Sequence, residues 1–430
     1  MLLGMILPVL IIFVGALFLI RLKGFFIFHP VKCARRLRQR MKDKEARRSL
    51  FLALAGTLGV GNIFGVAAGI LIGGAGSLFW LALATVFSAV IKYAEATLSA
   101  SLSGEDRGGI HKALAHIFPR CGSFLGALYA GLAVLLAFLM GSAIQSSALA
   151  SCAEAALDIP IGLSSLIFLF AVIISVAGKS DKIAKITEKV IPLTTIIYII
   201  MALSVIFVNI SRIPQTLSLI VKSAFAPASV GGGALSFLFS KGLSEGFARG
   251  TLSNEAGTGT SSLAHSRIST SEPSMAGLAG IVEVFFDTGL LCVLTGLAIL
   301  TSVDNFSSFS SPMKLVTAAF YSSLGEAGGA LLLLSVFLFA YSTVICWYYY
   351  GVECFSFLTR KATNKLFSLI FFAFIPIGAI VGEIRLIPFT DTVILFMSLL
   401  TLSALIISSD EICRRTEEAG LIKRKRKREL

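Results

Sequence analysis

Residues 56–69 read Gly-Thr-Leu-Gly-Val-Gly-Asn-Ile-Phe-Gly-Val-Ala-Ala-Gly and lie inside an apolar run. Five glycines in one such run are unusual, because glycine weakens a helix. A second segment, 232–263, repeats the feature, with glycines on both sides of Asn254-Glu255-Ala256. Unwound backbone at membrane depth is tolerated only where it lines a protein or water cavity. The pair therefore predicts two broken helices around one midplane site, with close helix packing through glycine as the alternative.

The composition of the chain requires a lipid environment. Of its 430 residues, 56% are hydrophobic and only 14% are charged, whereas soluble proteins average roughly 25% charged residues. The seven cysteines show no metal-ligand spacing and are expected to be free thiols. We therefore predict an all-α polytopic membrane protein with no organic cofactor.

Apolar runs of about 20 residues predict about eleven transmembrane helices. They lie at 2–20, 51–71, 77–102, 121–150, 161–177, 190–209, 232–263, 277–301, 328–358, 366–382 and 387–408. Five spans on each side of the central connection form two halves, and each half begins with a broken helix. Because five is odd, the second half must be inverted relative to the first. The predicted divisions are an extra N-terminal helix (1–22), a basic loop (23–50), the first repeat (51–209), an outer connection (210–231), the second repeat (232–409) and a basic tail (410–430).

The basic residues are distributed unevenly among the predicted loops. Most of the 37 Lys and Arg residues lie in alternate connections and in the tail, whereas the other loops hold only Arg212, Lys222, Lys314 and Arg385. The positive-inside rule then predicts an outside N-terminus and a cytoplasmic C-terminus in the cell (cytoplasmic/inner) membrane. The first apolar run lacks a basic region before it and a cleavage site after it, so we expect a retained helix. The basic run 423–428 is interpreted as a topology signal beside the lipid bilayer, and no nucleic-acid partner is expected.

Several strings along the chain resemble the alanine or glycine:cation symporter family. They are Gly59–Ala67, Gly73–Gly76, Lys92–Glu95, Phe247–Gly257, Phe286–Thr288, Tyr341–Thr343 and Trp347–Gly351. The resemblance implies membership of the amino acid, polyamine and organocation superfamily and a LeuT-like 5+5 inverted repeat with one extra N-terminal helix. It also implies import of a small neutral amino acid, typically alanine or glycine, with Na⁺ as the coupling ion.

The sequence departs from the family pattern at three places. Val60 stands between Gly59 and Gly61 where the family usually has Thr, so no hydroxyl is supplied there. A Gly-Gly-Pro-Met-Tyr-Tyr string is reduced to Gly-Gly-Ile-His at 108–111, and Glu283 replaces an expected apolar or glycine residue. These departures concern the substrate and the ion more than the fold.

Groups near the two breaks are the candidate substrate ligands. The LeuT-like resemblance implies that the amides of Val60 and Gly61 hold the substrate carboxylate, since glycine allows close backbone approach. Asn62 follows the break, where its side chain is predicted to bind substrate or, alternatively, to cap the restarted half helix. The remaining candidates are Gln145, Ser253 and Asn254. For Gln145, hydrogen bonding between helices is the equal alternative.

A pair of hydroxyl residues, Ser342 and Thr343, is the candidate Na⁺ site. Hydroxyl and carbonyl oxygens suit a hard monovalent cation, and the LeuT-like resemblance places this pair opposite the carbonyls of the first broken helix at Ala55 and Leu58. The alternative is that both hydroxyls bond to carbonyls of their own helix.

Charged residues inside membrane spans are costly, so each is expected to be functional or paired. Lys241, Glu245 and Arg249 are four residues apart, so we predict an ion-pair ladder that is structural or part of a gate. Glu283 and Asp287 are also four apart, and two neighbouring carboxylates could carry a coupling proton.

The sequence thus predicts a secondary active symporter that works by alternating access. An intramembrane hydrolase is disfavoured because Gly-x-Ser-x-Gly and His-Glu-x-x-His strings are missing, although Ser262 and His265 lie close in sequence. The remaining alternatives are a proton-coupled amino acid transporter, a channel and a non-transporting amino acid sensor.

Overall fold

The computed structural model describes residues 2–40, 42, 50, 53–102, 109–176, 180–226, 241–260, 262–263, 272–360 and 365–422. Its helices are α1 (Leu2–Arg21), α2 (Phe25–Phe28), α3 (Pro30–Arg40), η1 (Gly61–Gly65), α5 (Val66–Gly73), α6 (Ser77–Ser101), α7 (Ile110–Ile117), α8 (Gly122–Phe138), η2 (Leu139–Ile144), α9 (Gln145–Leu157), α10 (Ile161–Val176), α11 (Ser180–Val208), η3 (Ile210–Arg212), α12 (Ile213–Ala224), α14 (Lys241–Asn254), α16 (Pro273–Val284), η4 (Phe285–Cys292), α17 (Val293–Ser302), η5 (Phe306–Ser308), α18 (Pro312–Thr359), α19 (Lys365–Val381), α20 (Glu383–Ile407) and α21 (Ser409–Glu418). Residues 53–57 form a further helical turn. Within these ranges there is no strand, which confirms the all-α prediction.

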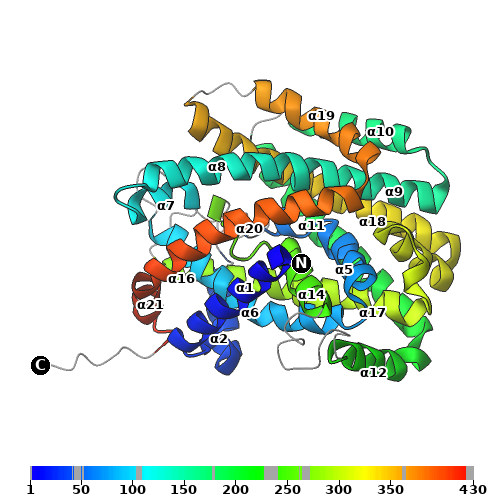
Figure 1. Cartoon of the computed structure of the whole chain (residues 1–430), viewed down its shortest axis with the longest axis horizontal. Helices are drawn as coiled ribbons and strands as arrows, with labels where there is room; N and C mark the ends of the chain where they lie inside the picture. Colours follow the sequence, from blue (N-terminus) through cyan, green and yellow to red (C-terminus); the bar gives the residue numbers. More distant parts are fainter. Residues whose placement is uncertain are drawn as a thin grey trace, which may run out of the picture.

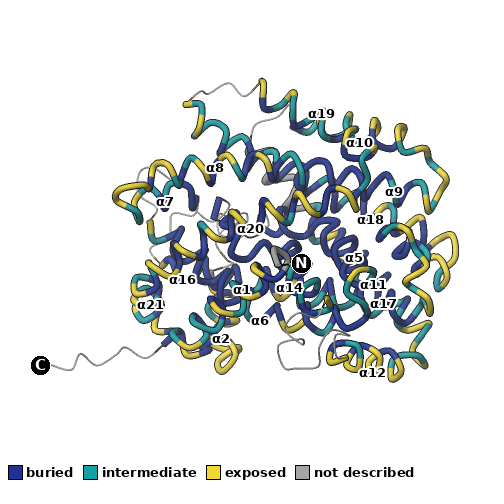
Figure 2. The backbone as a smooth tube through the Cα atoms, viewed as in Figure 1, coloured by how far each residue is buried: buried dark blue, intermediate teal, exposed yellow. Residues whose placement is uncertain are grey.

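The described chain contains six helices that are long and apolar enough to cross a membrane. Shorter apolar helices, among them α1, α10 and α19, lie beside them (Figure 1). Large apolar side chains are exposed on the outer helices; they include Phe124, Ile174, Phe207 and Ile380. Figure 2 shows exposed residues along the outward faces of these helices. Such exposure fits a surface that faces lipid.

Each predicted span falls on a helix, but several helices extend beyond their spans. Helix α11 begins at Ser180, before the span predicted at 190–209, and α18 begins at Pro312, before the span predicted at 328–358. A kink at Gly325, where φ is 66°, joins the two parts of α18. The differences arise because hydropathy locates the apolar stretch, whereas charged residues such as Lys and Glu also continue a helix.

Both glycine-rich segments are broken helices, as predicted. In the first, the turn at 53–57 stops, residues 58–60 are not helical, and η1 and α5 resume the helix. In the second, α14 ends at Asn254 and residues 255–260 are not helical, with positive φ at Glu255, Gly257 and Gly259. Glycine adopts this left-handed region without a Cβ clash. The start of the second span, 232–240, lies outside the described residues.

The basic loop after α1 and the C-terminal helix α21 meet at one end of the molecule. Arg21 donates hydrogen bonds to Ser409 and Asp410, and Lys32 Nζ donates to the Gly420 carbonyl at 2.7 Å. Figure 1 shows α2, α7 and α21 at this end, and α12 at the opposite end. The described parts of the basic loop and of the tail thus lie on the same side, in agreement with the charge distribution. The basic run 423–428 lies outside the described residues, and the orientation of the termini stays a prediction.

His111 on α7 is buried at the same end of the molecule. Neither ring nitrogen has a hydrogen-bond partner among the described residues, and the ring packs edge-on against Phe357 at 4.7 Å between centroids. Burial, assisted by the charge of Lys112, lowers the pKa of His111 from 6.5 to about 4.

Acid should therefore destabilise the protein through His111. Above pH 6.5 the imidazole is mostly neutral in both the folded and the unfolded protein, so its titration does not change the free energy of unfolding. As the pH falls from 6.5 to about 4, the unfolded chain binds a proton that the folded protein excludes, with a loss of up to about 3 kcal/mol. Melting curves in detergent should show a smaller acid-side loss for His111→Phe. An identical acid-side loss in that variant would contradict this assignment.

Candidate functional site

Thr343 of α18 contacts the first break. Its Oγ1 donates to the carbonyl oxygens of Ala55 at 3.2 Å and Leu58 at 3.4 Å. A Cβ atom at Gly59 would lie only 2.5 Å from Thr343 Oγ1, so glycine is required for this approach. The break thus brings two backbone oxygens and one hydroxyl together, and such neutral oxygens can hold Na⁺.

Ser342 makes different contacts from Thr343. Its Oγ donates to the carbonyls of Leu338 and Phe339, each at 3.0 Å, within its own helix. This is the back-bonding alternative that the sequence left open. The structure therefore brings Thr343 to the carbonyls of the first break, while the Ser342 hydroxyl stays on α18.

Asn62, in η1, makes hydrogen bonds through both its amide oxygen and its amide nitrogen. Its Oδ1 accepts from the Gly59 amide at 3.2 Å, inside the first break. Its Nδ2 donates to the backbone carbonyl of Asp287 at 3.1 Å and to the Asp287 carboxylate. Asn62 therefore ties the first broken helix to η4.

The Val60 amide, predicted to bind a substrate carboxylate, points at Gln145. Val60 N donates to Gln145 Oε1 at 3.3 Å. Gln145 Nε2 in turn donates to the Met140 carbonyl at 3.1 Å. The amide of the break is thus matched with an acceptor oxygen, which a substrate carboxylate could replace.

Asp287 is the buried carboxylate at which both broken helices meet. Its Oδ2 accepts from Ser253 Oγ at 2.8 Å and from Thr288 Oγ1 at 2.7 Å, in addition to the contact with Asn62. The side chain is fully buried. A carboxylate in this setting can neutralise the ammonium group of an amino acid.

Three π-helical segments supply groups to this site. Asn62 lies in η1, Gln145 directly follows η2, and Asp287 lies in η4. A π-turn adds a residue to the helical turn and often occurs at functional sites. The sequence predicted Asn62 and Gln145 at one site, but sequence patterns do not reveal π-turns, and the contact of Asn62 with Asp287 was not predicted.

Helix α6 holds the second break from both sides. Lys92 Nζ donates to the Asn254 carbonyl at 2.7 Å, and Glu95 Oε2 accepts from the Gly257 amide at 3.1 Å. Asn254 also stabilises the turn that follows α14, since its Oδ1 accepts from the Ala256 amide at 2.9 Å. A cation thus meets the carbonyl end of α14, and a carboxylate meets an amide freed by the break.

Glu283 and Asp287, the predicted carboxylate pair, bind different partners in this structure. Glu283 Oε1 lies 3.0 Å from Lys92 Nζ, and both side chains are fully buried. Asp287 instead binds Asn62, Ser253 and Thr288. Sequence reasoning missed Lys92 as a site residue, although it stands in the quoted Lys92–Glu95 string.

The predicted ladder on α14 is formed in part, and it gains an unforeseen partner. Arg249 Nε lies 3.1 Å from Glu245 Oε2, and its Nη2 lies 2.5 Å from Asp391 Oδ2 of α20. Lys241 is exposed at the start of α14. A Cβ atom at Gly69 would touch Arg249 Cγ at 3.2 Å, so the pair also lies against α5. Asp391, a charge inside an apolar span, was the available signal for this contact.

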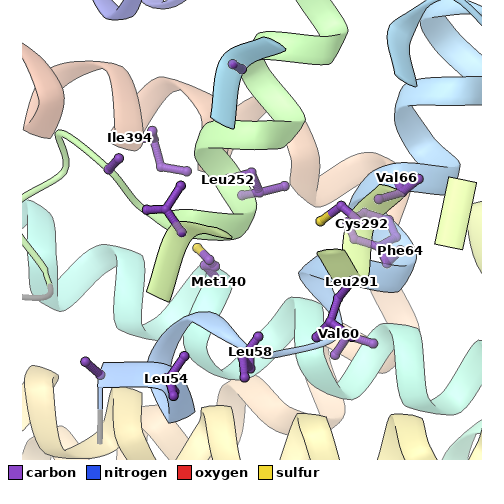
Figure 3. Close-up of a cluster of buried hydrophobic side chains, with 14 of the residues drawn as sticks. Leu54, Leu58, Val60, Phe64, Val66, Met140, Leu252, Leu291, Cys292 and Ile394 are labelled. Atoms are coloured by element: carbon purple, nitrogen blue, oxygen red, sulfur yellow. The ribbon is translucent and has the colours of Figure 1, made fainter. Parts of the chain in front are cut away.

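Apolar side chains surround the polar groups of the two breaks. Figure 3 shows Leu58 and Val60 from the first broken helix, Leu252 from α14 and Met140 from η2 in one cluster. All four are buried. The two breaks also approach closely, since a Cβ atom at Gly61 would lie 3.7 Å from Ser253 Cα.

Residues 1–429 match the model of the sodium:alanine symporter family. The chain belongs to this family. It is 31% identical to the "Sodium/alanine symporter AgcS" of Methanococcus maripaludis over 84% of this chain and 83% of the relative. It is also 31% identical to the "Probable sodium/glutamine symporter GlnT" of Bacillus subtilis, over 93% of this chain and 84% of the relative.

The fold resembles that of solved transporters of the LeuT type. The structure of MhsT in complex with L-phenylalanine superimposes with a TM-score of 0.62 over 88% of this chain and 92% of that one, at 16% identity. The predictions of family, of a LeuT-like fold and of a multi-pass transporter rather than an enzyme are therefore confirmed.

Proposed function

We propose that this sodium:alanine symporter family member imports a small neutral amino acid together with Na⁺. The observation that carries the proposal is the meeting of the two breaks. Backbone amides, the Asn62 amide and the Asp287 carboxylate lie together there, beside the carbonyls bound by Thr343.

An amino acid presents a carboxylate and an ammonium group at a fixed spacing. The amides of Val60 and Gly61 are the proposed ligands of the carboxylate, with Gln145 giving up its hydrogen bond to Val60 N. Asp287 is the proposed counter-charge for the ammonium group, with Asn62 and Ser253 holding its oxygens. Asn254 supports this arrangement through Thr288 Oγ1 at 2.9 Å.

The surroundings favour a small neutral side chain. Leu58, Val60, Met140 and Leu252 bring no charge to the breaks. The short Gly61 to Ser253 approach leaves little room between the two backbones. A bulky or charged substrate side chain would therefore lose packing or remain buried without a partner.

Na⁺ is proposed to bind where Thr343 Oγ1 meets the carbonyls of Ala55 and Leu58, with Ser342 adjacent. Without the ion, Thr343 donates its proton to these carbonyls. With the ion, its oxygen lone pairs would face Na⁺, which would tie the first broken helix to α18. The Arg249 pairs with Glu245 and Asp391 are proposed as a gate between α14 and α20.

Uptake into proteoliposomes tests this function. We expect saturable accumulation of alanine or glycine driven by an inward Na⁺ gradient, competed by small neutral amino acids and not by glutamate or lysine. Accumulation driven by a pH gradient alone would favour a proton-coupled transporter. Tight binding of an amino acid without any uptake would favour a sensor.

A further inference from the structure

A buried cluster of charged side chains surrounds the second break. It consists of Lys92 and Glu95 on α6, Glu255 in the break and Glu283 on α16, none of them more than 2% exposed. The charge of Lys92 acts on all three carboxyl groups. Within the described chain, one ammonium group is therefore shared by three carboxyl groups.

The negative charges of the three carboxyl groups are balanced to different extents by ion pairs and hydrogen bonds. Glu283 lies 3.0 Å from Lys92 Nζ, and Glu95 accepts from the Gly257 amide at 3.1 Å. Glu255 accepts a hydrogen bond from Thr260 through Oε2, whereas its Oε1 has no hydrogen-bond partner among the described residues. A buried carboxylate that lacks a partner destabilises the folded protein. Of the three carboxyl groups, Glu255 has the weakest set of partners for a negative charge.

The other groups that face Glu255 do not supply a cation. Asp287 of η4 adds a like charge. The charge of Glu255 also acts on three other side chains, which are Tyr129 of α8 and Tyr350 and Cys346 of α18. Phenol and thiol groups are neutral in their protonated forms, so none of them balances a second negative charge.

We propose that Glu255 binds a proton in this conformation and that Lys92, Glu255 and Glu283 form a proton site of the carrier. The proton would reside on the carboxyl group of Glu255, while Glu283 keeps Lys92. Glu255 is also the first non-helical residue of the break, with a left-handed backbone (φ 55°). Opening of the break would move this carboxyl group away from the cluster and release the proton.

The proton site should be visible in the melting temperature of the purified protein in detergent, without substrate. A folded state that holds this proton loses stability as the pH rises, by up to about tenfold in the unfolding equilibrium per pH unit for one proton. Glu255→Gln keeps the shape and cannot ionise, so its melting temperature should fall less between about pH 6 and 9. Glu154→Gln is the matched control, because Glu154 is half exposed and pairs with Lys314 at 3.3 Å.

A second variant keeps the proposal testable if Glu255→Gln does not fold. Glu283→Gln frees Lys92 to pair with Glu255, so Glu255 should remain ionised and the loss of stability on the alkaline side should shrink as well. Wild-type pH dependence in either folded variant would overturn the proposal. A rise in melting temperature with Na⁺ that needs Glu255 and is the same at every pH would also overturn it, in favour of a metal cation.

The consequence for transport rests on the proposed symport function. Na⁺-driven uptake by the wild type should fall several-fold as the pH on both sides of the vesicle is raised, and Glu255→Gln should be less sensitive to pH. Equal pH sensitivity of the two would overturn the role in transport. If no vesicle takes up any amino acid, the proposed function fails, whereas the melting experiment still decides the proton site.

Discussion

Replacing Thr343 with alanine should raise the Na⁺ concentration for half-maximal uptake about tenfold or more. Thr343 Oγ1 is the side-chain oxygen that reaches the carbonyls of Ala55 and Leu58. Loss of one ligand from a site shielded from water costs about 1 to 3 kcal/mol. Because Na⁺ at this place would tie the first broken helix to α18, weaker binding should also depopulate the conformation that accepts substrate.

Ser342→Ala is the matched comparison for Thr343→Ala. The two residues are adjacent, but the Ser342 hydroxyl donates to carbonyls of its own helix. We therefore expect a clearly smaller change in the apparent Na⁺ affinity. Initial rates of amino acid uptake at a series of Na⁺ concentrations measure both variants. Equal effects of the two substitutions, or uptake by Thr343→Ala with wild-type Na⁺ dependence, would argue against this ion site.

Features that depend on backbone and residue order could be predicted from the sequence. The glycines of 56–69 and 232–263 predicted the two breaks, because an accumulation of glycine weakens a helix and is evident from the sequence alone. The contact of Thr343 with Ala55 and Leu58 was predicted through the family resemblance, which supplies the pairing of two distant helices. Hydropathy located the spans, although not the ends of α11 and α18.

Pairings between distant side chains could not be predicted in the same way. Lys92 and Glu283 meet across two helices, as do Arg249 and Asp391. The i,i+4 spacing on one helix correctly predicted the pair of Glu245 with Arg249. The same spacing suggested a pair of Glu283 with Asp287, but Asp287 lies in the π-helical segment η4 and the two carboxyl groups contact different partners. Spacing rules assume a regular α-helix, and three π-turns at this site break that assumption.

Gly61→Leu should abolish uptake while the protein still inserts into the membrane. Gly61 does not have a positive φ, so a side chain there causes no backbone strain. Its nearest neighbour is Ser253 Cα, 3.7 Å from the added Cβ. Alanine therefore fits with ordinary contact, whereas the longer leucine side chain extends into the space between the two breaks, where the substrate is proposed to bind.

The series Gly61→Ala and Gly61→Leu separates occupation of the site from damage to the fold. Alanine should weaken uptake of alanine more than that of glycine, because the added methyl group competes with the substrate side chain. Gly131→Leu on α8 is the matched control, since nothing lies within 4 Å of its added Cβ and the position is exposed. That variant should transport normally. Uptake of alanine and glycine by Gly61→Leu at the wild-type rate would place the substrate elsewhere, because a leucine side chain and an amino acid cannot share the space between Gly61 and Ser253.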